Sequence, residues 1–469
     1  MYNILDYGAI GDGKTLNTNA IQEAVNKCAE AGGGTVYIPA DGKFVSGTVH
    51  LLDNVHILFE NGAMLLGSKD INDFEPIEEL ACLEFQDRSH SFFHQSLFYA
   101  ENCNNISFSG KGLIDMQSCW QIDKGWRQAR QLIAPKCAAP DYDYDAFLNK
   151  YDSVWYRGAK PIALKECNNV VISDLTIKNA TDLAVYFAGC ENVRVLGLYI
   201  ESYIDGISPD SCKNVVISDC IVNVGDDAIV LKSSYTLNRL KYCENISITN
   251  CVISSRCNAI KFGTESITGF INITISNCTI YNTRFSGIIL AAADGAVLDG
   301  ISVTNVTMRN VGNPFSILIL NRGQSPENTP IGRIRNITFS NITATGPYEE
   351  WKAKPHGYQA FISNNVMETP QIIPALIVGQ PDSVIENIAL TNIQITVPGA
   401  GTFEDRQIMI ENIRDGYPDC LCFGEKLPMY GLFARNVNNL KMYNVNFYTY
   451  KKDEREAILL DGVTNFKNI

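Results

Sequence analysis

The sequence predicts an all-β fold in which short parallel strands stack as a solenoid, with one helix at its N-terminal end. A motif that begins with Asn recurs at positions 169, 192, 214, 245 and 272, at intervals of 22 to 31 residues, which is the range of solenoid repeats. Within each copy apolar residues alternate with other residues, the pattern of a strand with one buried face. A unit this short cannot bury its apolar face alone, so the copies must stack as coils of parallel sheet.

Composition sets bounds on the domain organisation and on the function. The chain has 469 residues, 46% of them hydrophobic, and because a solenoid grows without splitting we expect residues 1–469 to form a single domain. The net charge of −13, with no basic cluster, argues against a nucleic-acid partner. No apolar run is long enough to cross a membrane. No signal peptide is visible, so we expect a cytoplasmic protein, or a secreted or periplasmic one if a signal segment was removed.

The chain has 15 cysteines, and several of them recur at fixed positions of the repeat. Those that lie two residues before the repeat Asn are Cys103, Cys167, Cys190, Cys212 and Cys243, and those that lie six after it are Cys220, Cys251 and Cys278. This pattern indicates small buried apolar side chains, so we expect no disulfides. Only His90 and His94 are close together and no Cys-x-x-Cys occurs, so we expect neither a metal site nor a cofactor. Reduced cysteines favour the cytoplasm.

Residues 8–15, Gly-Ala-Ile-Gly-Asp-Gly-Lys-Thr, match the phosphate-loop pattern. Asp12, however, would put a carboxylate among the amides that bind phosphate, and Asn17-Thr18 resemble a cap that starts the helix later. The alternating strand–helix pattern that such loops require does not follow. We therefore interpret the segment as a turn before an amphipathic helix, residues 18–30, that caps the solenoid, with nucleotide binding as the alternative.

Residues 70–160 interrupt the repeat apart from one coil near Asn105. This insertion is rich in aromatic residues, namely Phe92, Phe93, Trp120, Trp126, Tyr142, Tyr144, Trp155 and Tyr156. Long insertions are usually functional, and aromatic rings either stack on sugars or pin loops by burial, so both interpretations stay open. Regular coils resume at Pro161 and run to about Asn310, and residues 345–435 form looser, loop-rich coils.

Three stretches carry a resemblance to a known family. The opening run Asn3–Gly13, with the helix and Gly32–Pro39, resembles the entry segment of pectin-degrading right-handed β-helix proteins. The stretch Leu52–Ser68 narrows the resemblance to the polygalacturonase-like glycoside hydrolases of family 28, and it continues to Leu427–Leu432. The resemblance implies a single-stranded right-handed parallel β-helix of about ten coils. It also implies a glycosidase that acts on pectin-type or related oligosaccharides, with carbohydrate metabolism and pectin degradation as its context.

Four motifs of family 28, Asn-Thr-Asp, Asp-Asp, Gly-His-Gly and Arg-Ile-Lys, are only partly kept. Residues 203–205, Tyr-Ile-Asp, keep the first aspartate, and residues 225–228, Gly-Asp-Asp-Ala, keep both of the pair. Residues 257–259, Cys-Asn-Ala, lack the histidine, and residues 289–291, Ile-Leu-Ala, lack both cations. The catalytic aspartates therefore survive, whereas the recognition residues do not.

The resemblance implies that Asp226 protonates the leaving oxygen while Asp205 and Asp227 hold the attacking water, with inversion at the anomeric carbon. Crowded carboxylates raise one another's pKa, so one of them can stay protonated near neutral pH. Asp205 and Asp226 are about one coil apart, so we expect them to be neighbours on one sheet face. The alternative is that these aspartates cap turns, as Asp174 and Asp219 do in ordinary coils.

The missing Arg and Lys, which in the family are thought to bind the galacturonate carboxylate, leave the substrate open between a galacturonide and a rhamnogalacturonan-like or neutral-sugar linkage. The candidate substrate-binding residues are Asn258, Lys232, Lys261, Arg256, Arg322 and Tyr186. The charged ones equally fit a solvated surface. The aromatic insertion and the loops after Asn321 and Gly346 are predicted to close one end of the groove, which favours exo-action on short oligosaccharides.

Two other functions fit the same scaffold. A β-helix lyase would use calcium and a basic residue to remove a proton next to a uronate carboxylate, and calcium-independent activity would separate it from a hydrolase. A non-catalytic carbohydrate-binding β-helix would explain the departures at Asn258 and Ile289, but it gives no reason for three aspartates to persist. The sequence leaves the oligomeric state open.

Overall fold

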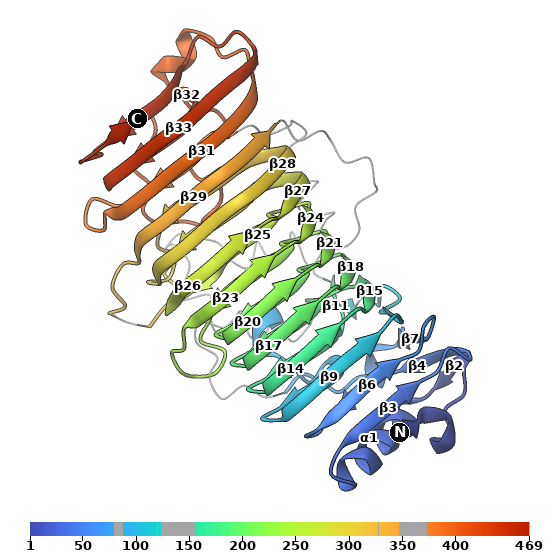
Figure 1. The fold of residues 1–469 in the computed structure, drawn as a ribbon. Coiled ribbons are helices and arrows are strands. Elements are labelled where there is room, and N and C mark those ends of the chain that lie inside the picture. Colours follow the sequence, from blue (N-terminus) through green and yellow to red (C-terminus); the bar gives the residue numbers. More distant parts are fainter. Residues whose placement is uncertain (79–87, 120, 123–155, 327, 347–372, 469) are drawn as a thin grey trace. The chain divides into compact units, whose positions relative to one another are not determined.

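The computed structural model describes residues 1–78, 88–119, 121–122, 156–326, 328–346 and 373–468. These residues form two compact units. The first contains Met1–Gly225 and Tyr235–Arg239, and the second contains Asp226–Ser234 and the described chain from Leu240 onward. In each unit short strands pair in parallel from coil to coil, so the predicted parallel β-helix is confirmed (Figure 1). The single domain over residues 1–469 stays a prediction.

Each coil of the first unit contributes strands to three parallel sheets, numbered here in the order in which the coil meets them. Sheet 1 contains β1 (Tyr2–Asn3), β3 (Gly34–Ile38), β6 (Val55–Phe59), β9 (Asn104–Gly110), β14 (Asn168–Ser173), β17 (Glu191–Leu196) and β20 (Lys213–Ser218). Sheet 2 contains β2 (Asp12–Leu16), β4 (Lys43–Ser46), β7 (Met64–Gly67), β10 (Leu113–Asp115), β15 (Thr176–Ala180), β18 (Tyr199–Ser202) and β21 (Ile221–Val224). Sheet 3 contains β5 (Val49–His50), β8 (Ser96–Glu101), β13 (Lys160–Lys165), β16 (Val185–Ala188) and β19 (Ile207–Asp210).

The second unit has the same three sheets, but several of its strands are long enough to bend from one sheet into the next. Its strands are β22 (Ile229–Ser233), β23 (Cys243–Thr249), β24 (Val252–Ser255), β25 (Ile260–Ser266), β26 (Gly269–Ser276), β27 (Thr279–Ala292), β28 (Val297–Ile319), β29 (Arg333–Thr345), β30 (Ala375–Val378), β31 (Ile385–Gly399), β32 (Met429–Arg435), β33 (Val437–Lys451), β34 (Glu456–Asp461) and β35 (Lys467–Asn468). Sheet 3 of this unit runs through β22, β25, the ends of β27 and β28, and then β30, β32 and β34.

A few short elements lie outside the sheets. They are the helices η1 (Ile4–Tyr7), α1 (Thr18–Glu30), η2 (Ile71–Asp73), α2 (Arg88–Ser91) and η3 (Glu404–Gln407), and the antiparallel pair β11 (Gln121–Ile122) and β12 (Tyr156–Arg157). In the part of the chain that the structure describes, no helix has the length and apolarity that a membrane crossing requires.

Helix α1 confirms the predicted cap. It buries Ile21, Ala24, Val25 and Cys28 on one face. That face lies against β1, β3 and β5, so the helix covers the apolar end of the first coil (Figure 1). The segment before it ends in strand β2, where two amides are already used, because Asp12 Oδ1 accepts from Lys14 N at 2.8 Å and from Thr15 N at 2.7 Å. A carboxylate therefore sits where a phosphate loop would hold its ligand. Residues 12–16 are a strand that pairs with β4, and not part of the predicted turn.

The repeat Asn has a conformational role. Asn169, Asn192 and Asn214 all have φ of 57°, in the left-handed region that Asn tolerates better than other side chains. Their amides also form a ladder along the coils, with Asn169 Nδ2 donating to Asn105 Oδ1 at 2.7 Å and Asn214 Nδ2 to Asn192 Oδ1 at 3.0 Å. Asn therefore recurs because it fits the bend and binds the equivalent residue of the preceding coil.

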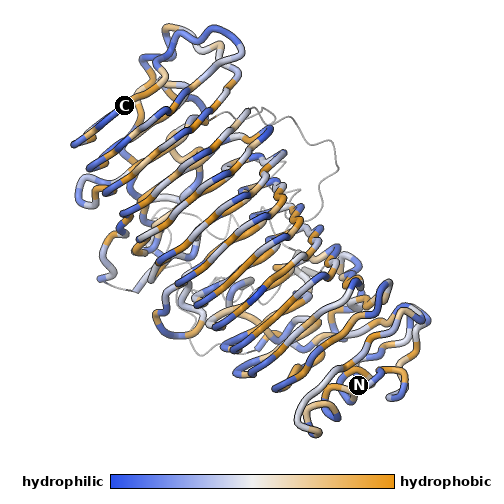
Figure 2. The backbone as a smooth tube through the Cα atoms, viewed as in Figure 1, coloured by the Kyte–Doolittle hydropathy of each residue, from blue (hydrophilic) through white to orange (hydrophobic). Residues whose placement is uncertain are grey.

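Burial differs between the sheets, and this difference locates the functional surface. In sheet 1 apolar and polar residues alternate along each strand, as the colours of Figure 2 show, so one face is buried and the other solvated. In sheet 3 every residue of β16, β22 and β25 is buried. Other segments must therefore cover the outer face of sheet 3, and side chains on that face lie between two layers of chain.

In the part of the chain that the structure describes, no two cysteines form a disulfide. Cys167, Cys190 and Cys212 come from successive coils and are buried. Burial raises the pKa of the Cys190 thiol well above its usual value, so this sulfur is a neutral apolar side chain and not a reactive thiolate.

We predict that the protein contains no disulfide. Thiol titration of the denatured, unreduced protein should find nearly all of the 15 cysteines free, because residues locked at turn positions pack as small hydrophobes. A matched titration after reduction gives the total. Finding three or fewer free thiols before reduction would contradict the prediction.

Candidate active site

Asp226 and Asp227 lie in the turn that leads into β22 of the second unit. The turn is tied to the next coil, because Ala228 N donates to Asn258 O at 3.0 Å. Ser255 Oγ, at the end of β24, donates to the carbonyl oxygen of Asp226. Asp227 is buried, whereas Asp226 is half-buried. The turn therefore holds one carboxylate in the interior and leaves the neighbouring residue partly accessible.

Three donors converge on the carboxylate of Asp227. Oδ1 accepts from Asn258 N at 3.2 Å and from Asn258 Nδ2 at 2.8 Å, and Oδ2 lies 2.8 Å from Lys261 Nζ. The Lys261 and Asp227 side chains are only 4% and 5% exposed. A charged pair at this depth is tolerated only when its geometry is good and further hydrogen bonds satisfy its oxygens. The site meets both conditions, which suits an ionised Asp227.

Lys261 supplies the positive charge of the site from the outer face of β25. Burial disfavours the charged form of this lysine, but the carboxylate of Asp227 outweighs burial and raises the pKa of Lys261 well above its usual value. In the strand register Lys261 pairs with Ile289, which stands where the family motif has its Arg. The cation therefore lies one coil earlier than the motif would place it.

Asn258 stands where the family motif has its histidine, and it holds the carboxylate of Asp227 in place by hydrogen bonds. Its Nδ2 donates to Asp227 Oδ1, and its Oδ1 accepts from Ser286 N of the following coil at 3.1 Å. An amide suits this position because it carries a donor and an acceptor on one short side chain. Its predicted role in substrate binding stays a prediction, since its side chain lies between Asp227 and the next coil and is 5% exposed.

Asp226, Asp227 and Cys257 each offer one ligand atom, and these atoms lie within 4.8 Å of one another. Burial, helped by the charges of Asp226 and Asp227, raises the pKa of the Cys257 thiol well above its usual value. Cys257 is therefore a neutral thiol and a poor metal ligand, because the thiolate is the ligand form. The cation that the structure puts against these carboxylates is the ammonium of Lys261.

In the second unit four charged residues from successive coils lie near the C-terminal ends of the sheet 3 strands. This charged row consists of Lys232, Glu265, Asp294 and Arg322. Lys232 Nζ lies 2.7 Å from Glu265 Oε2. Arg322 binds Asp294 through two contacts, Nε to Oδ1 at 3.0 Å and Nη2 to Oδ2 at 2.6 Å. Burial raises the pKa of the Asp294 carboxyl, and the Arg322 guanidinium acts in the opposite direction. Lys232 and Arg322 therefore each have a carboxylate partner, and their binding of substrate stays a prediction.

Tyr417 is a site residue that the sequence interpretation missed. Its hydroxyl lies 3.0 Å from Lys261 Nζ and 2.8 Å from Thr264 Oγ1, and Lys261 Nζ lies 5.1 Å from the centre of its ring. The residue comes from a loop outside the repeat, so no periodic signal marks it. The charged row did have a signal in the sequence. Its four residues recur at intervals of 28 to 33 residues, with Lys232 one interval before Glu265, and Asp294 one interval before Arg322.

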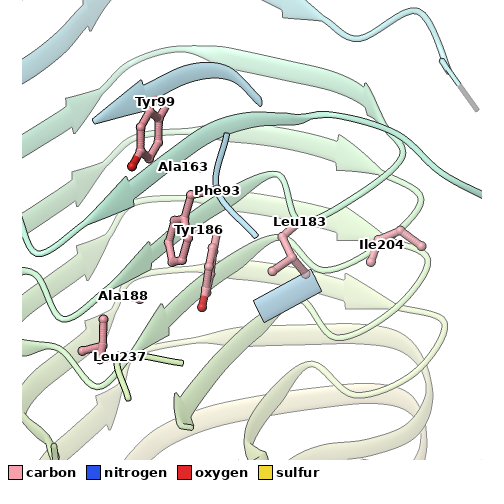
Figure 3. Close-up of a cluster of buried hydrophobic side chains, with 8 residues drawn as sticks. All are labelled: Phe93, Tyr99, Ala163, Leu183, Tyr186, Ala188, Ile204 and Leu237. Carbon is pink, nitrogen blue, oxygen red and sulfur yellow. The ribbon is translucent and has the colours of Figure 1, made fainter. Parts of the chain in front are cut away.

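Two predicted residues belong to the first unit. Asp205 lies before β19, is 5% exposed, and accepts a hydrogen bond at its carbonyl oxygen from Ala184 N at 3.0 Å. Tyr186 lies in a buried cluster where its ring stacks on Phe93 at 5.1 Å and its hydroxyl donates to His90 O (Figure 3). Its side chain is fully buried, so a role in substrate binding stays a prediction that would need this cluster to open.

Of the remaining predicted residues, some lie in the described chain and others lie outside it. Arg256 is half-buried in the turn before Asn258. In the aromatic insertion Phe92 and Phe93 are buried, as the pinning interpretation expects. Trp120, Trp126, Tyr142, Tyr144 and Trp155 lie outside the described residues. The same is true of residues 347–372, which contain most of the predicted loop after Gly346.

Two family models match the chain, "Glycosyl hydrolases family 28" over residues 155–356 and "Rhamnogalacturonase A/epimerase, pectate lyase-like" over residues 1–229. A probable polygalacturonase of Vitis vinifera is 27% identical over 326 residues, which cover 66% of this chain and 61% of that protein. An exo-poly-α-D-galacturonosidase of Dickeya chrysanthemi is 24% identical over 432 residues, which cover 84% of this chain and 71% of that protein.

The fold also matches a solved structure. A family 28 exopolygalacturonase of Yersinia enterocolitica superposes with a TM-score of 0.68 at 20% identity, covering 99% of this chain and 77% of that one. The predicted right-handed parallel β-helix is therefore confirmed.

We predict that Lys261→Met destabilises the protein by about 3–5 kcal/mol, because it leaves the buried carboxylate of Asp227 without its partner. The pKa of Lys261 is raised in the folded state, so its stabilising contribution is fully present below its usual value of 10.5 and is lost only as the pH rises through the folded-state pKa. Urea unfolding at neutral pH measures the difference.

The control is Lys165→Met, which removes a pair of similar length, 2.9 Å to Glu101, from a site where both side chains are partly exposed. This change should cost less than about 1 kcal/mol. Adding Asp227→Asn to Lys261→Met should recover part of the loss, because no unpaired charge then remains. Equal unfolding midpoints for Lys261→Met and wild type would show that the buried pair does not stabilise the fold.

Proposed function

We propose that the chain is a glycosidase of family 28 of the glycosyl hydrolases, which hydrolyses galacturonan-type oligosaccharides and releases their units from one chain end. The observation that carries the proposal is the turn Asp226–Asp227, in which a half-buried acid stands beside a buried carboxylate paired to Lys261. The relatives named above support the substrate class by their own activities.

The proposed chemistry assigns a different task to each carboxyl group of the turn. Asp226 is partly accessible, so it suits the acid that protonates the leaving oxygen. Asp227, surrounded by Lys261 and the two donors of Asn258, suits a group that stays charged through the reaction and stabilises the positive charge that develops on the sugar.

The general base that activates the water is assigned from the distance between the carboxyl groups. Atoms of Asp226 and Asp227 lie within 4.8 Å, whereas inverting glycosidases separate their two carboxyl groups by roughly 6.5–9.5 Å to admit a water. Inversion therefore calls for a base besides Asp227, and the family resemblance offers Asp205. We propose that Asp205 activates the water.

We propose Arg256 as the cation that binds a substrate carboxylate. Arg256, half-buried in the turn before Asn258, comes from the same coil as Lys261 and carries a guanidinium that matches a carboxylate in two contacts. A galacturonide is therefore favoured over a neutral sugar, although the motif cations at 289 and 291 are missing.

We further propose that the protein works in a reducing compartment, the cytoplasm, on short fragments. Support comes from the cysteines of the described residues, most of which are buried and none of which forms a disulfide, because thiols would be exposed to oxidation during folding elsewhere. Exo-action fits short fragments because an enzyme that binds a chain end needs no long open groove.

We predict activity on polygalacturonate and on trigalacturonate, and much weaker activity on rhamnogalacturonan and neutral oligosaccharides. On the polymer, reducing ends should rise while viscosity falls slowly, because cleavage at chain ends shortens each chain by little. A chelator should leave the rate unchanged, which separates hydrolysis from a calcium-dependent lyase. Rapid loss of viscosity with few reducing ends would refute exo-action.

We predict that Asp226→Asn lowers kcat by about 10²–10⁴-fold, the usual contribution of a general acid. A galacturonide with an activated leaving group needs less protonation, so its hydrolysis should be impaired less. Asp205→Asn should impair both substrates alike. The matched control is Asp174→Asn, at an exposed turn position with φ of 61° that Asn also accepts. Near-full activity of Asp226→Asn would place the acid elsewhere.

A further inference from the structure

One segment of the second unit leaves the regular coils and runs along sheet 3. We call residues 409–424, between η3 and β32, the strap. Its backbone is held by successively earlier coils as it advances. Arg435 Nη2 donates to Ile410 O at 3.1 Å, Gln380 Nε2 donates to Ile413 O at 3.0 Å, and Asn321 N donates to Arg414 O at 2.8 Å. The strap therefore runs backward along the unit, toward the coil that carries Lys261.

The strap ends this run at the candidate active site. Gly416 N donates to Asn321 O at 3.0 Å, which fixes the residue next to Tyr417. The Tyr417 hydroxyl then meets Lys261 Nζ and Thr264 Oγ1 at 3.0 and 2.8 Å. One hydroxyl thus joins a loop to the lysine that holds Asp227, across 156 residues of sequence.

The hydroxyl of Tyr417 is held by hydrogen bonds, whereas much of the residue is exposed. The residue is 54% exposed, whereas the Lys261 side chain below it is 4% exposed. An aromatic ring held at its tip and at its backbone loses little further freedom when it binds a ligand. The ring is apolar and its centre lies 5.1 Å from Lys261 Nζ, so a sugar bound beside Asp226 and Asp227 would lie close to it.

We propose that Tyr417 is a specificity-determining residue, whose ring stacks on the apolar face of the hexopyranose bound beside Asp226 and Asp227. Its hydroxyl keeps Lys261 against Asp227, so one residue couples sugar binding to the state of the catalytic carboxylate. This inference rests on the proposed function, since it takes the ligand to be a galacturonide. It assigns a site residue to the strap, a part of the chain that matches no motif of the family.

Two substitutions separate the ring from the hydroxyl. Tyr417→Ala removes both and should raise KM for trigalacturonate roughly 3- to 10-fold, the range of one aromatic contact. Tyr417→Phe keeps the ring, so KM should stay near wild type, while kcat falls and its pH profile moves because Lys261 loses a partner. The matched control is Tyr450→Ala, a more exposed tyrosine on β33, which should change neither KM nor kcat.

Binding gives a readout that does not depend on turnover. Calorimetric titration of trigalacturonate into Asp226→Asn, and into Asp226→Asn with Tyr417→Ala, should show Kd rising by the same 3- to 10-fold. An active wild type with unchanged KM and Kd in the Tyr417→Ala proteins would overturn the role of Tyr417 and leave the proposed function standing. A wild type that neither cleaves nor binds trigalacturonate would overturn both.

Discussion

The coil spacing is the constraint on which the site depends. Equivalent residues of successive coils lie about 4.8 Å apart, so a charged side chain on sheet 3 always faces the equivalent position of its neighbour. Both faces of that sheet are buried, and a buried charge without a partner is costly. Opposite charges must therefore be placed on adjacent coils. Lys232 meets Glu265 of the next coil, and Lys261, whose register partner is Val230, meets Asp227 three residues before that partner.

The same constraint explains how the chain does without the family's cations. A positive charge at position 289 would face Lys261 directly, because the two residues pair in the strand register. Two like charges at that spacing would repel each other, so a lysine at 261 and an isoleucine at 289 form a compatible pair. Asn258 also connects successive coils, since its side-chain amide donates to Asp227 of the preceding coil and accepts from Ser286 of the following one.

Much of the fold was predictable because it is periodic. The alternating motif marked the strands, its interval marked the coils, and residues 18–30 carried both the cap and the apolar face of α1. The aspartates at 226 and 227 were marked by the family motif, and Lys261 was marked by its place in the same repeat. Periodicity indicates which residues share a sheet face. It therefore identifies the candidate site residues that belong to sheet 3 or to the turns that lead into it.

The partners of these residues were harder to predict. Tyr417 reaches Lys261 from a strap without repeat, and only tertiary contacts determine where such a segment runs. Lys232 and Arg322 were predicted on the right face, but their pairing with Glu265 and Asp294 depends on side-chain geometry. Tyr186 shows the opposite case, because its position in the repeat does not reveal that Phe93 covers it.

The central claim is that a glycosidic bond is hydrolysed by an acid at Asp226 and a water held by a separate base. The most direct test is the anomeric configuration of the first sugar released from trigalacturonate, followed by proton NMR before mutarotation. Direct displacement by water inverts the α linkage, so the account predicts β-galacturonate as the first product. Release of the α anomer would contradict it, because retention requires a covalent intermediate on one of the carboxylates.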